Sequence, residues 1–376
     1  LEAGALKAAH DHFIHAAQEA GRANDDQLLV EALIDEAHST VGLGHPNDSL
    51  GLLDAAQAIT LRGGVAPSDA IALARGAALH DAGRNPEAIA VLKPLVAAAE
   101  ARAARDPRQK IALSITLARL GEVMLAVEDF DGARALYARC VALDEASFGT
   151  THPEVAKSLA DLAISEYHLD RFAESRAHLA RAHQIIVASY GEHNFLAGKL
   201  YIAEGSLAAR EQQFALGIAS YEAAARTLAG TLAPDHPIFV TIEEGLGELL
   251  RDEDKCAEAV PHIEKVLRLL ERSGTDPKHH ALELIEYGAC LVYSDRLDDG
   301  VTALHQALAE MQENQLPVHW SAEPKAILAE VEWEHHHKAA AIALLREAIA
   351  ASAGKDTGEF RTMHAAEEAR LAEMMK

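Results

Sequence analysis

The chain has 376 residues, of which 49% are hydrophobic but only 5% are aromatic, and its formal net charge at pH 7 is −24. A surface this acidic repels nucleic-acid phosphates and anionic lipid headgroups, so neither nucleic acid nor a lipid surface is an expected partner. No run of about 18 apolar residues occurs, which argues against direct insertion into a membrane. The many Ala and Leu residues, with abundant Glu, Arg and Gln, favour helices and predict an all-α protein.

The segment 1–22, which begins LEAGALKAAHDHFIHAAQEAG, is predicted to form a helix. We interpret it as the remnant of a preceding repeat. The chain begins with Leu1 and not with Met, which suggests a fragment of a longer protein.

An internal repeat occupies residues 27–352, and a column of small residues marks it in eight copies at steps of 39 to 45 residues. This ladder column consists of Ser49, Ala88, Ala133, Ser175, Gly217, Ala259, Gly300 and Ala341. Twelve residues earlier stands a column of only Gly or Ala: Ala37, Gly76, Gly121, Ala163, Gly205, Gly247, Gly288 and Ala329. Seven residues later stand Ala56, Leu95, Cys140, Ala182, Ala224, Val266, Ala307 and Ala348.

These columns predict helical hairpins, because two antiparallel helices approach closely only where their side chains are small. Glycine within a helix costs up to about 1 kcal/mol relative to alanine, so its frequent use indicates a need for close backbone contact. The ladder column is expected late in each second helix. One hairpin cannot bury its own apolar face, so the hairpins must stack on one another.

The segments THPE, DHP, DPRQ and TDPK each stand where a first helix is predicted to begin. Thr151, Asp106, Asp235 and Thr275 are the expected N-caps, and the prolines fit the first turn. Thr151 and Glu154 have the spacing of a capping box. We therefore interpret the His-Pro pairs of this pattern as helix starts without a catalytic role.

The segment 356–376 is predicted to be an amphipathic helix that caps the last repeat. The expected fold is a right-handed superhelical solenoid of antiparallel helix hairpins, with about eight repeats and seventeen or eighteen helices in all.

The two segments LARLGEVMLAVEDFDGARALYARC (117–140) and LADLAISEYHLDRFAESRAHLARA (159–182) are similar to tetratricopeptide repeats. Their period of about 42 residues resembles the variant found in kinesin light chains. The resemblance implies a protein-binding groove lined by the first helices.

The alanine-rich array also resembles the C-terminal repeat region of bacterial, myxobacterial-type serine/threonine protein kinases. This resemblance implies that the chain is the interaction arm of a kinase whose catalytic domain lies upstream.

The sequence contains no recognisable catalytic motif, and no enzymatic activity is predicted for this chain. EDFDG at 128–132 is interpreted as an interhelical turn, and GEHNFLAGKL lacks the spacing of a phosphate-binding loop. The cysteines Cys140, Cys256 and Cys290 are far apart in sequence, so neither a disulfide framework nor a zinc site is expected.

Two groups of histidines are candidate metal ligands, His12 with His15 and the EHHHK segment at 334–338. Three consecutive histidines on one turn point in different directions, whereas zinc needs convergent ligands. Both groups are therefore interpreted as solvated polar faces, and no metal and no cofactor is expected.

The resemblance implies partner-binding positions on the first helices. These are Arg119, Glu122, Lys157, Asp161, Tyr167, His168, Lys199, Ser206, Arg210, Glu244, Glu248, Arg251, Glu286, Tyr293, Glu323, Glu330 and Trp333. The positions are mixed or basic in copies three to five and mostly acidic in copies six to eight, which predicts a partner with a basic segment. The aromatic residues are the expected anchors.

Two functions fit this pattern. The first is a protein-interaction or scaffolding arm of a bacterial serine/threonine kinase, and the alternative is a stand-alone regulator that senses a peptide or ligand.

The cysteines, which have no expected disulfide partners, are typical of a cytoplasmic protein. A membrane span upstream in the parent protein would instead place the array outside the cytoplasm.

Overall fold

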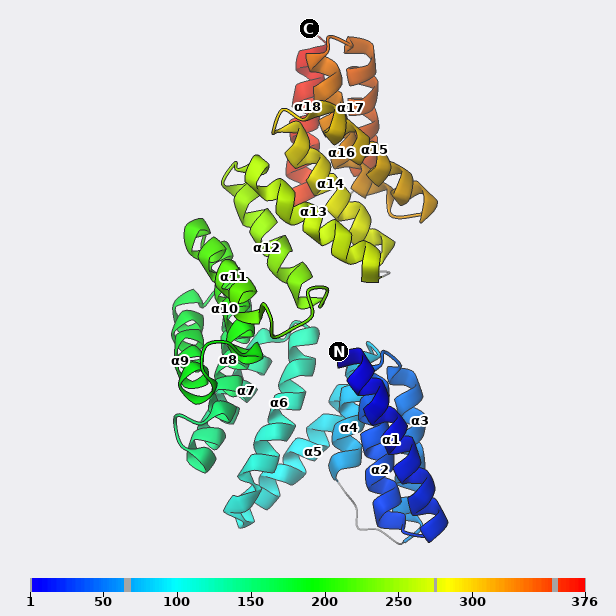
Figure 1. Cartoon of the computed structure of the whole chain (residues 1–376), viewed down its shortest axis with the longest axis vertical. Helices are drawn as coiled ribbons and strands as arrows, with labels where there is room; N and C mark the ends of the chain where they lie inside the picture. Colours follow the sequence, from blue (N-terminus) through cyan, green and yellow to red (C-terminus); the bar gives the residue numbers. More distant parts are fainter. Residues whose placement is uncertain (1, 64–68, 274–275, 354–357, 376) are drawn as a thin grey trace. The chain divides into compact units, whose positions relative to one another are not determined.

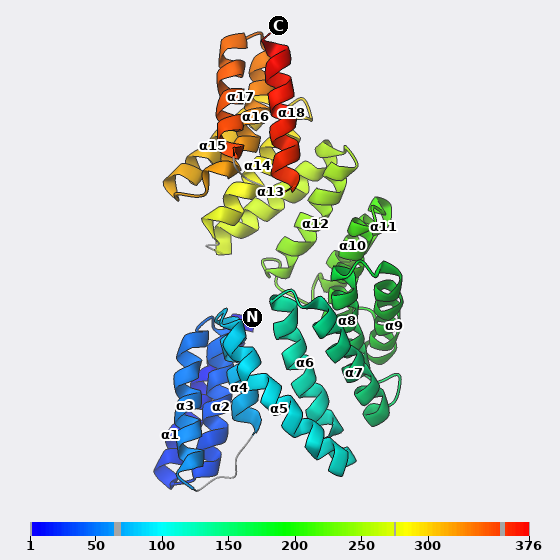
Figure 2. The ribbon, with the colours of Figure 1, turned by 180° about the vertical axis from the view of Figure 1, so that it is seen from behind.

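The computed structural model describes residues 2–63, 69–273, 276–353 and 358–375, and within these ranges the chain is all-α (Figures 1 and 2). It forms eighteen α-helices in the described part, packed as consecutive antiparallel hairpins in the manner of a tetratricopeptide repeat solenoid. The all-α repeat fold predicted from the sequence is thereby confirmed. None of the described helices is both long and apolar enough to cross a membrane.

The chain divides into two compact units, Leu1–Ala203 and Glu204–Lys376, and the division falls inside α10 (Phe195–Arg210). The first unit contains α1 (Glu2–Ala23), α2 (Asp26–Gly42), α3 (Pro46–Leu61), α4 (Asp69–Asp81), α5 (Asn85–Arg105), α6 (Lys110–Ala126), α7 (Phe130–Phe148), α8 (Pro153–His168) and α9 (Phe172–Tyr190). The second contains α11 (Phe214–Leu228), α12 (Ile238–Asp252), α13 (Cys256–Ser273), α14 (Pro277–Val292), α15 (Leu297–Glu313), α16 (Ala322–Glu334), α17 (Lys338–Ser352) and α18 (Gly358–Met374).

The small-residue columns mark the hairpin contacts, as predicted, and every member of the three columns is buried. The ladder column, however, lies at the fourth residue of each second helix and not late in it, so that part of the prediction is wrong. Several of its members lie against the first helix of the same hairpin: the Ser175 hydroxyl donates to the Ala163 carbonyl at 2.8 Å, and a β-carbon on Gly300 would lie 2.8 Å from the Gly288 carbonyl oxygen. The helices are therefore closest just after the turn that joins them.

A fourth column explains why the first helix so often carries glycine. Four residues after each ladder position a large side chain is buried: Leu53, Leu92, Tyr137, Leu179, Tyr221, Ile263, Leu304 and Leu345. This side chain covers the small residue of the first helix. A β-carbon placed on Gly121 would lie 2.8 Å from Cζ of Tyr137, and one on Gly205 would lie 2.9 Å from Cδ2 of Tyr221. Both copies with tyrosine in this column have glycine opposite it, because the ring leaves no room for a methyl group.

The turn inside each hairpin contains one residue with a left-handed backbone, five positions before the ladder column. The eight residues, with φ between 55° and 85°, are Gly44, Gly83, Glu128, Asp170, Gln212, Asp254, Asp295 and His336. Only the first two are glycine, the residue that adopts this conformation without steric cost. His336 is the middle residue of EHHHK, so this segment forms the last hairpin turn, as the sequence indicated.

The helix starts differ in detail from the prediction, because His152 is the N-cap of α8 and Pro237 is the N-cap of α12. The backbone N–H of Glu154 donates to Nδ1 of His152 at 3.2 Å, and that of Ile238 donates to Nδ1 of His236 at 3.2 Å. Thr151 and Asp235 are therefore not the N-caps, and the capping box is not formed. The structural role of the His-Pro pairs is confirmed.

The other two predicted caps also need revision. Asp106 caps a short 3₁₀ helix, Pro107–Gln109, that precedes α6. Thr275 lies outside the described residues, and Asp276 caps α14 by accepting from the Lys278 N–H at 3.0 Å.

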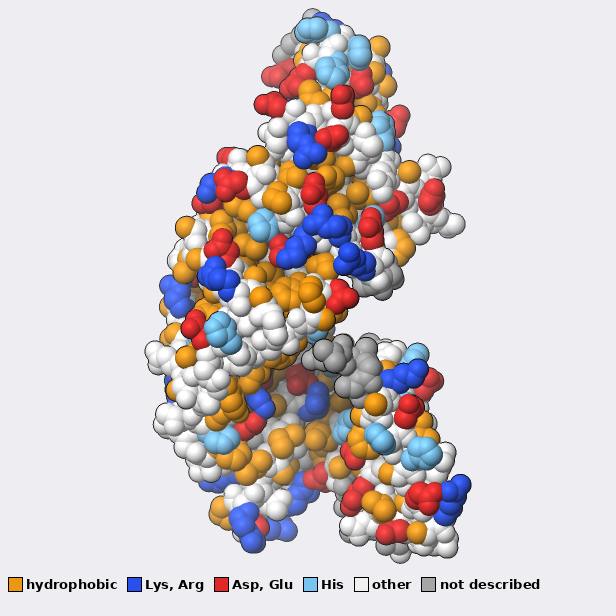
Figure 3. Space-filling view, viewed as in Figure 1, with side chains coloured by type: hydrophobic (Ala, Val, Ile, Leu, Met, Phe, Trp, Pro, Cys, Tyr) orange, Lys and Arg blue, Asp and Glu red, His pale blue; other side chains and the backbone are white. Residues whose placement is uncertain are grey.

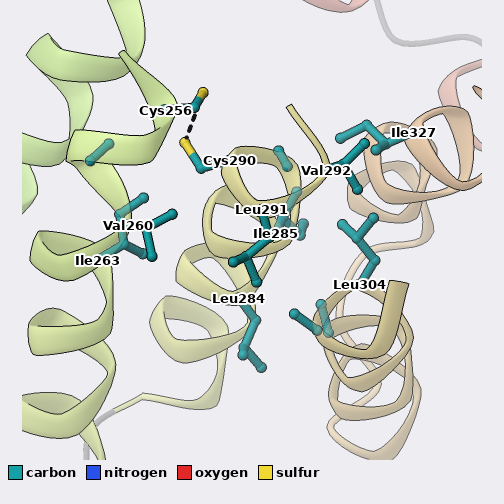
Figure 4. Close-up of a cluster of buried hydrophobic side chains, with 14 of the residues drawn as sticks. Cys256, Val260, Ile263, Leu284, Ile285, Cys290, Leu291, Val292, Leu304 and Ile327 are labelled. Carbon is teal, nitrogen blue, oxygen red and sulfur yellow. Dashed lines mark hydrogen bonds between the residues drawn. The ribbon is translucent and has the colours of Figure 1, made fainter. Parts of the chain in front are cut away.

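Two of the cysteines meet in the core of the second unit, although 34 residues separate them (Figure 4). The sulfur atoms of Cys256, at the start of α13, and Cys290, in α14, lie 3.2 Å apart, and both side chains are buried. Burial raises the pKa of Cys290 to about 12, so the thiol form dominates at neutral pH. The pair packs among aliphatic side chains such as Val260 and Leu291 as small hydrophobic groups.

Candidate functional site

Two adjoining pockets in the second unit are lined by successive first helices. The first pocket, of about 420 Å³, lies between α12 and α14, and the second, of about 390 Å³, lies among α14, α16 and α18. Arg251 and Glu286 line both pockets. We call their joint lining the acidic groove; its polar residues are Glu244, Glu248, Arg251, His279, Glu283, Glu286, Tyr293, Glu323, Glu330, Glu367 and Arg370.

The groove brings together seven of the eight residues predicted in copies six to eight. These are Glu244, Glu248, Arg251, Glu286, Tyr293, Glu323 and Glu330. The eighth, Trp333, is half-buried against Ala329, Leu345 and Met374, and the Lys338 ammonium lies 5.3 Å from its ring centroid. Trp333 therefore supports the packing of α18 and does not line the groove.

Negative charge dominates the groove, which contains seven carboxylates against two arginines. Each arginine is paired inside it, Arg251 with Glu286 and Arg370 with Glu330. Figure 3 shows acidic, basic and hydrophobic side chains interleaved on the visible face of α12 and α13. The groove thus offers a net negative field to an incoming cationic group.

The end of the groove between α12 and α14 is the most crowded with acids. Nε2 of His279 lies 2.5 Å from Oε1 of Glu244 and 4.0 Å from Oε1 of Glu283. Burial, followed by the charge of Glu244, raises the pKa of Glu283 to about 7, against the opposing effect of His279.

One ligand atom from each of Glu244, His279 and Glu283 lies within 4.8 Å of the others. Nitrogen and oxygen donors of this kind suit a zinc ion. A divalent cation would compete with a basic side chain for this end of the groove, so binding measurements there need a chelator.

The sequence reasoning missed four residues of the groove. His279 and Glu283 precede Glu286 by seven and three positions, so helical spacing on α14 would have placed them on the same face. Glu367 and Arg370 come from α18, which is not a repeat copy, so the columns contain no information about which face it buries.

A smaller pocket in the first unit holds part of the predicted basic surface. It has a volume of about 280 Å³ and lies between α8 and α10, where it is lined by Lys157, Asp161 and Lys199 among apolar residues. The Lys157 ammonium donates to Glu154 at 2.7 Å, and the Lys199 ammonium lies 5.9 Å from the Phe195 ring centroid. We call this the Lys157 pocket.

The other predicted residues of copies three to five lie outside this pocket. Arg119 pairs with Glu122 on α6. Tyr167 makes an edge contact with His168 at 5.1 Å, and His168 stacks on Phe130 at 4.5 Å.

Copy five is divided between the two units. Lys199 belongs to the first unit, while Ser206 and Arg210 belong to the second. The Ser206 hydroxyl lies 2.9 Å from that of Tyr221, and Arg210 ends α10.

The histidines named as candidate metal ligands have other environments. His12 and His15 are exposed on α1. His335 follows α16, His336 adopts the left-handed turn conformation, and Nδ1 of His337 lies 2.8 Å from the Glu332 carboxylate.

Comparison with known proteins supports the repeat assignment. Residues 111–186 match the sequence model of the family described as tetratricopeptide repeat. No curated protein matches the chain.

Several solved structures are similar. The fold is similar to BtubC (BKLC) from P. vanneervenii, at 16% identity over 61% of this chain and 92% of that one, with a TM-score of 0.54. A putative kinesin light chain with TPR-like repeats from Podosopora anserina is 15% identical over 53% of this chain and 95% of its own, with a TM-score of 0.47. A STAND signal-transduction ATPase with a tetratricopeptide repeat sensor, from Pyrococcus horikoshii, is 12% identical over 82% of this chain and 49% of its own, with a TM-score of 0.60.

At these identities the structural likenesses concern the fold. Residues 111–186 match the tetratricopeptide repeat model, and the described helices on both sides of that segment form similar hairpins.

Proposed function

We propose that the chain is a protein-interaction module whose acidic groove binds a basic segment of a partner protein. The observation that carries the proposal is the charge of the groove, where first helices of three successive hairpins contribute most of seven carboxylates and only two arginines are present. Tetratricopeptide repeats are a scaffold for binding proteins and peptides, and the acidic groove lies mainly on the first helices of the repeat hairpins.

The physical basis is partial desolvation of a cationic side chain between carboxylates. A hydrogen bond to a charged group contributes about 1.5–3 kcal/mol, whereas an exposed ion pair contributes about 0–1 kcal/mol. Glu283 and Glu244 are only partly exposed, so the free energy that each contributes to binding a cation should lie between these two values. Tyr293, at the other end of the groove, offers an aromatic anchor.

The Lys157 pocket is proposed as a second contact surface of opposite sign. Its two lysines would suit an acidic side chain of the partner, together with Arg119 and Tyr167 elsewhere on the first unit. Arg210 of the second unit stays a proposed contact on the basis of its position in the repeat.

The proposal is tested by fluorescence anisotropy with a labelled twelve-residue peptide of alternating Lys or Arg and Ala, in 0.15 M salt with EDTA. At pH 8, above the raised pKa of Glu283, Glu248→Gln with Glu283→Gln removes about two charges from the groove. The matched control, Glu258→Gln with Glu271→Gln, removes two charges from exposed positions of α13. We expect the groove variant to bind about tenfold more weakly, which corresponds to about 1.4 kcal/mol, and the control to change less than about twofold.

Equal losses in both variants would mean that the peptide responds only to the overall charge of the chain. Failure of every basic peptide to bind the parent would contradict the proposed function.

A finer proposal is that the module is the arm of a bacterial serine/threonine protein kinase. It rests on the alanine-rich style of the repeats, which resembles that of such arms. Sequencing the gene upstream of Leu1 tests it, since a kinase domain in the same reading frame is the expected result.

The alternative is a stand-alone regulator that senses a peptide. It is favoured by the fold similarity to a protein whose tetratricopeptide repeats are described as a sensor. An upstream sequence without a kinase domain, together with a change in conformation on peptide binding, would support this alternative.

A further inference from the structure

The second pocket of the acidic groove lies among α14, α16 and the last helix, α18. Its volume of about 390 Å³ is typical of a small-molecule or side-chain pocket. The floor is apolar and is formed by Ala289, Ala326, Ile327, Leu345 and Ala366. We call it the Glu367 pocket after the acidic residue that α18 contributes.

Glu367 is a buried carboxylate with an unsatisfied oxygen. The residue is only 5% exposed, and its Oε1 has no hydrogen-bond partner. Oε2 has a long contact of 3.5 Å with the Ser352 hydroxyl. Buried polar atoms are almost always satisfied, so an orphaned carboxylate oxygen in a residue that lines a pocket points to a ligand that carries a donor.

The charges of the lining determine the kind of donor. Four carboxylates, those of Glu286, Glu323, Glu330 and Glu367, face two guanidinium groups, so the formal excess is two negative charges. Arg251 and Arg370 are already paired with Glu286 and Glu330. Neither arginine therefore donates a hydrogen bond to Oε1 of Glu367. A cationic donor would satisfy this oxygen and would also reduce the excess negative charge of the pocket.

We propose that the Glu367 pocket binds a cationic head on an aliphatic stem, such as an arginine or lysine side chain of the partner. The proposal rests on the proposed function and adds the position and chemistry of one anchor. The stem would lie on the apolar floor, and the head would donate to Oε1 of Glu367. Tyr293, which is 59% exposed, would cover the cation at the rim.

In the described part of the chain, neither of the other two pockets combines excess negative charge with a buried polar atom that lacks a hydrogen-bond partner. Among the described residues, the buried side-chain atoms without a partner belong to Arg134, His280 and Glu367, and only the last lines one of the three pockets described above. The Glu367 pocket is thus the place where a missing donor and excess negative charge coincide.

The test uses the whole chain, free agmatine and cadaverine as small cations, and a pair of basic peptides that differ by Arg in place of norleucine at one position. Glu367→Gln neutralises the buried carboxylate, and Glu368→Gln is the matched control one residue along α18, with a side chain that is 63% exposed. Isothermal titration is run in EDTA after circular dichroism has shown that each variant is folded. Glu323→Gln serves as a second variant, since it lies in the same pocket at an exposed position.

We expect Glu367→Gln to weaken binding of the Arg peptide about tenfold, and Glu368→Gln to change it less than about twofold. Replacing Arg by norleucine should cost about tenfold on the parent and little on Glu367→Gln, because both changes remove the same interaction. Binding of agmatine that depends on Glu367, with no binding of either basic peptide, would support a free small cation as the ligand and contradict the proposed peptide function. Basic peptides that bind parent and Glu367→Gln equally would overturn the pocket proposal while leaving the proposed function intact.

Discussion

Replacing Gly300 by alanine is expected to destabilise the second unit by about 2–3 kcal/mol, although alanine is the better helix former. A β-carbon at this position would lie 2.8 Å from the carbonyl oxygen of Gly288 and 2.9 Å from the backbone nitrogen of Val292. Both neighbours are backbone atoms of α14, so the clash is relieved only if α14 and α15 move apart. That movement would loosen the buried contacts of Leu304, which packs between them.

The control is the same substitution at Gly51 of α3, where an added methyl group would have no atom within 4 Å. There alanine should stabilise the chain by about 0.5–1 kcal/mol through helix propensity. Thermal unfolding followed by circular dichroism compares the two variants, with an expected loss of roughly 5–10 °C for Gly300→Ala. A gain of stability in both variants would show that the ladder glycines are not packing contacts.

Asp161→Asn is expected to stabilise the first unit at pH 8 and to leave it nearly unchanged at pH 4. Burial, followed by the charge of Glu122 on α6, raises the pKa of Asp161 to about 6, against the opposing effects of Lys199 and Lys157. A raised folded-state pKa means that the folded protein holds this proton more tightly than the unfolded chain does. The Asp161 contribution to stability is therefore present at low pH and is lost as the pH rises from about 4 to 6 or above.

A shift of one pKa unit corresponds to about 1.4 kcal/mol, and the pKa of Asp161 rises from 3.8 to about 6, so the difference between the parent and the asparagine variant should reach about 3 kcal/mol above pH 7. Urea unfolding curves at intervals between pH 4 and pH 8 measure this difference, and other titrating groups cancel in the comparison. Parallel stability profiles across the whole range would contradict the assignment of the raised pKa to Asp161.

The repeat could be predicted from the sequence because its signal is steric. Small residues at positions such as Gly288 and Gly300 are required wherever two helix backbones touch. They therefore recur once in every hairpin, and this pattern does not depend on which partner protein the chain binds. The position of the ladder within the helix could not be predicted as securely. The left-handed residue that precedes each second helix is Glu, Gln, Asp or His in six copies, and none of these indicates a turn as clearly as glycine does.

The groove was predictable where it lies on the repeat and not beyond it. The groove positions of Glu244, Glu248 and Glu286 could be predicted, because all three residues lie on the inward face of first helices. Glu367 could not be predicted, because its place depends on how α18 docks on α17, which no periodicity specifies. The cysteine pair was unpredictable for a similar reason: Cys256 and Cys290 belong to different hairpins, and only the stacking of α13 on α14 brings the two sulfur atoms to 3.2 Å.

The central claim is that the first helices of the second unit form the binding surface, and hydrogen–deuterium exchange tests it most directly. Exchange would be measured on the chain alone and with a saturating basic peptide, since local protection reports where a ligand restrains the backbone. We predict new protection in α12, α14 and α16 and in the part of α18 around Glu367, with α11, α13 and α15 unchanged. Protection confined to α11, α13 and α15, or to the Lys157 pocket of the first unit, would contradict this claim.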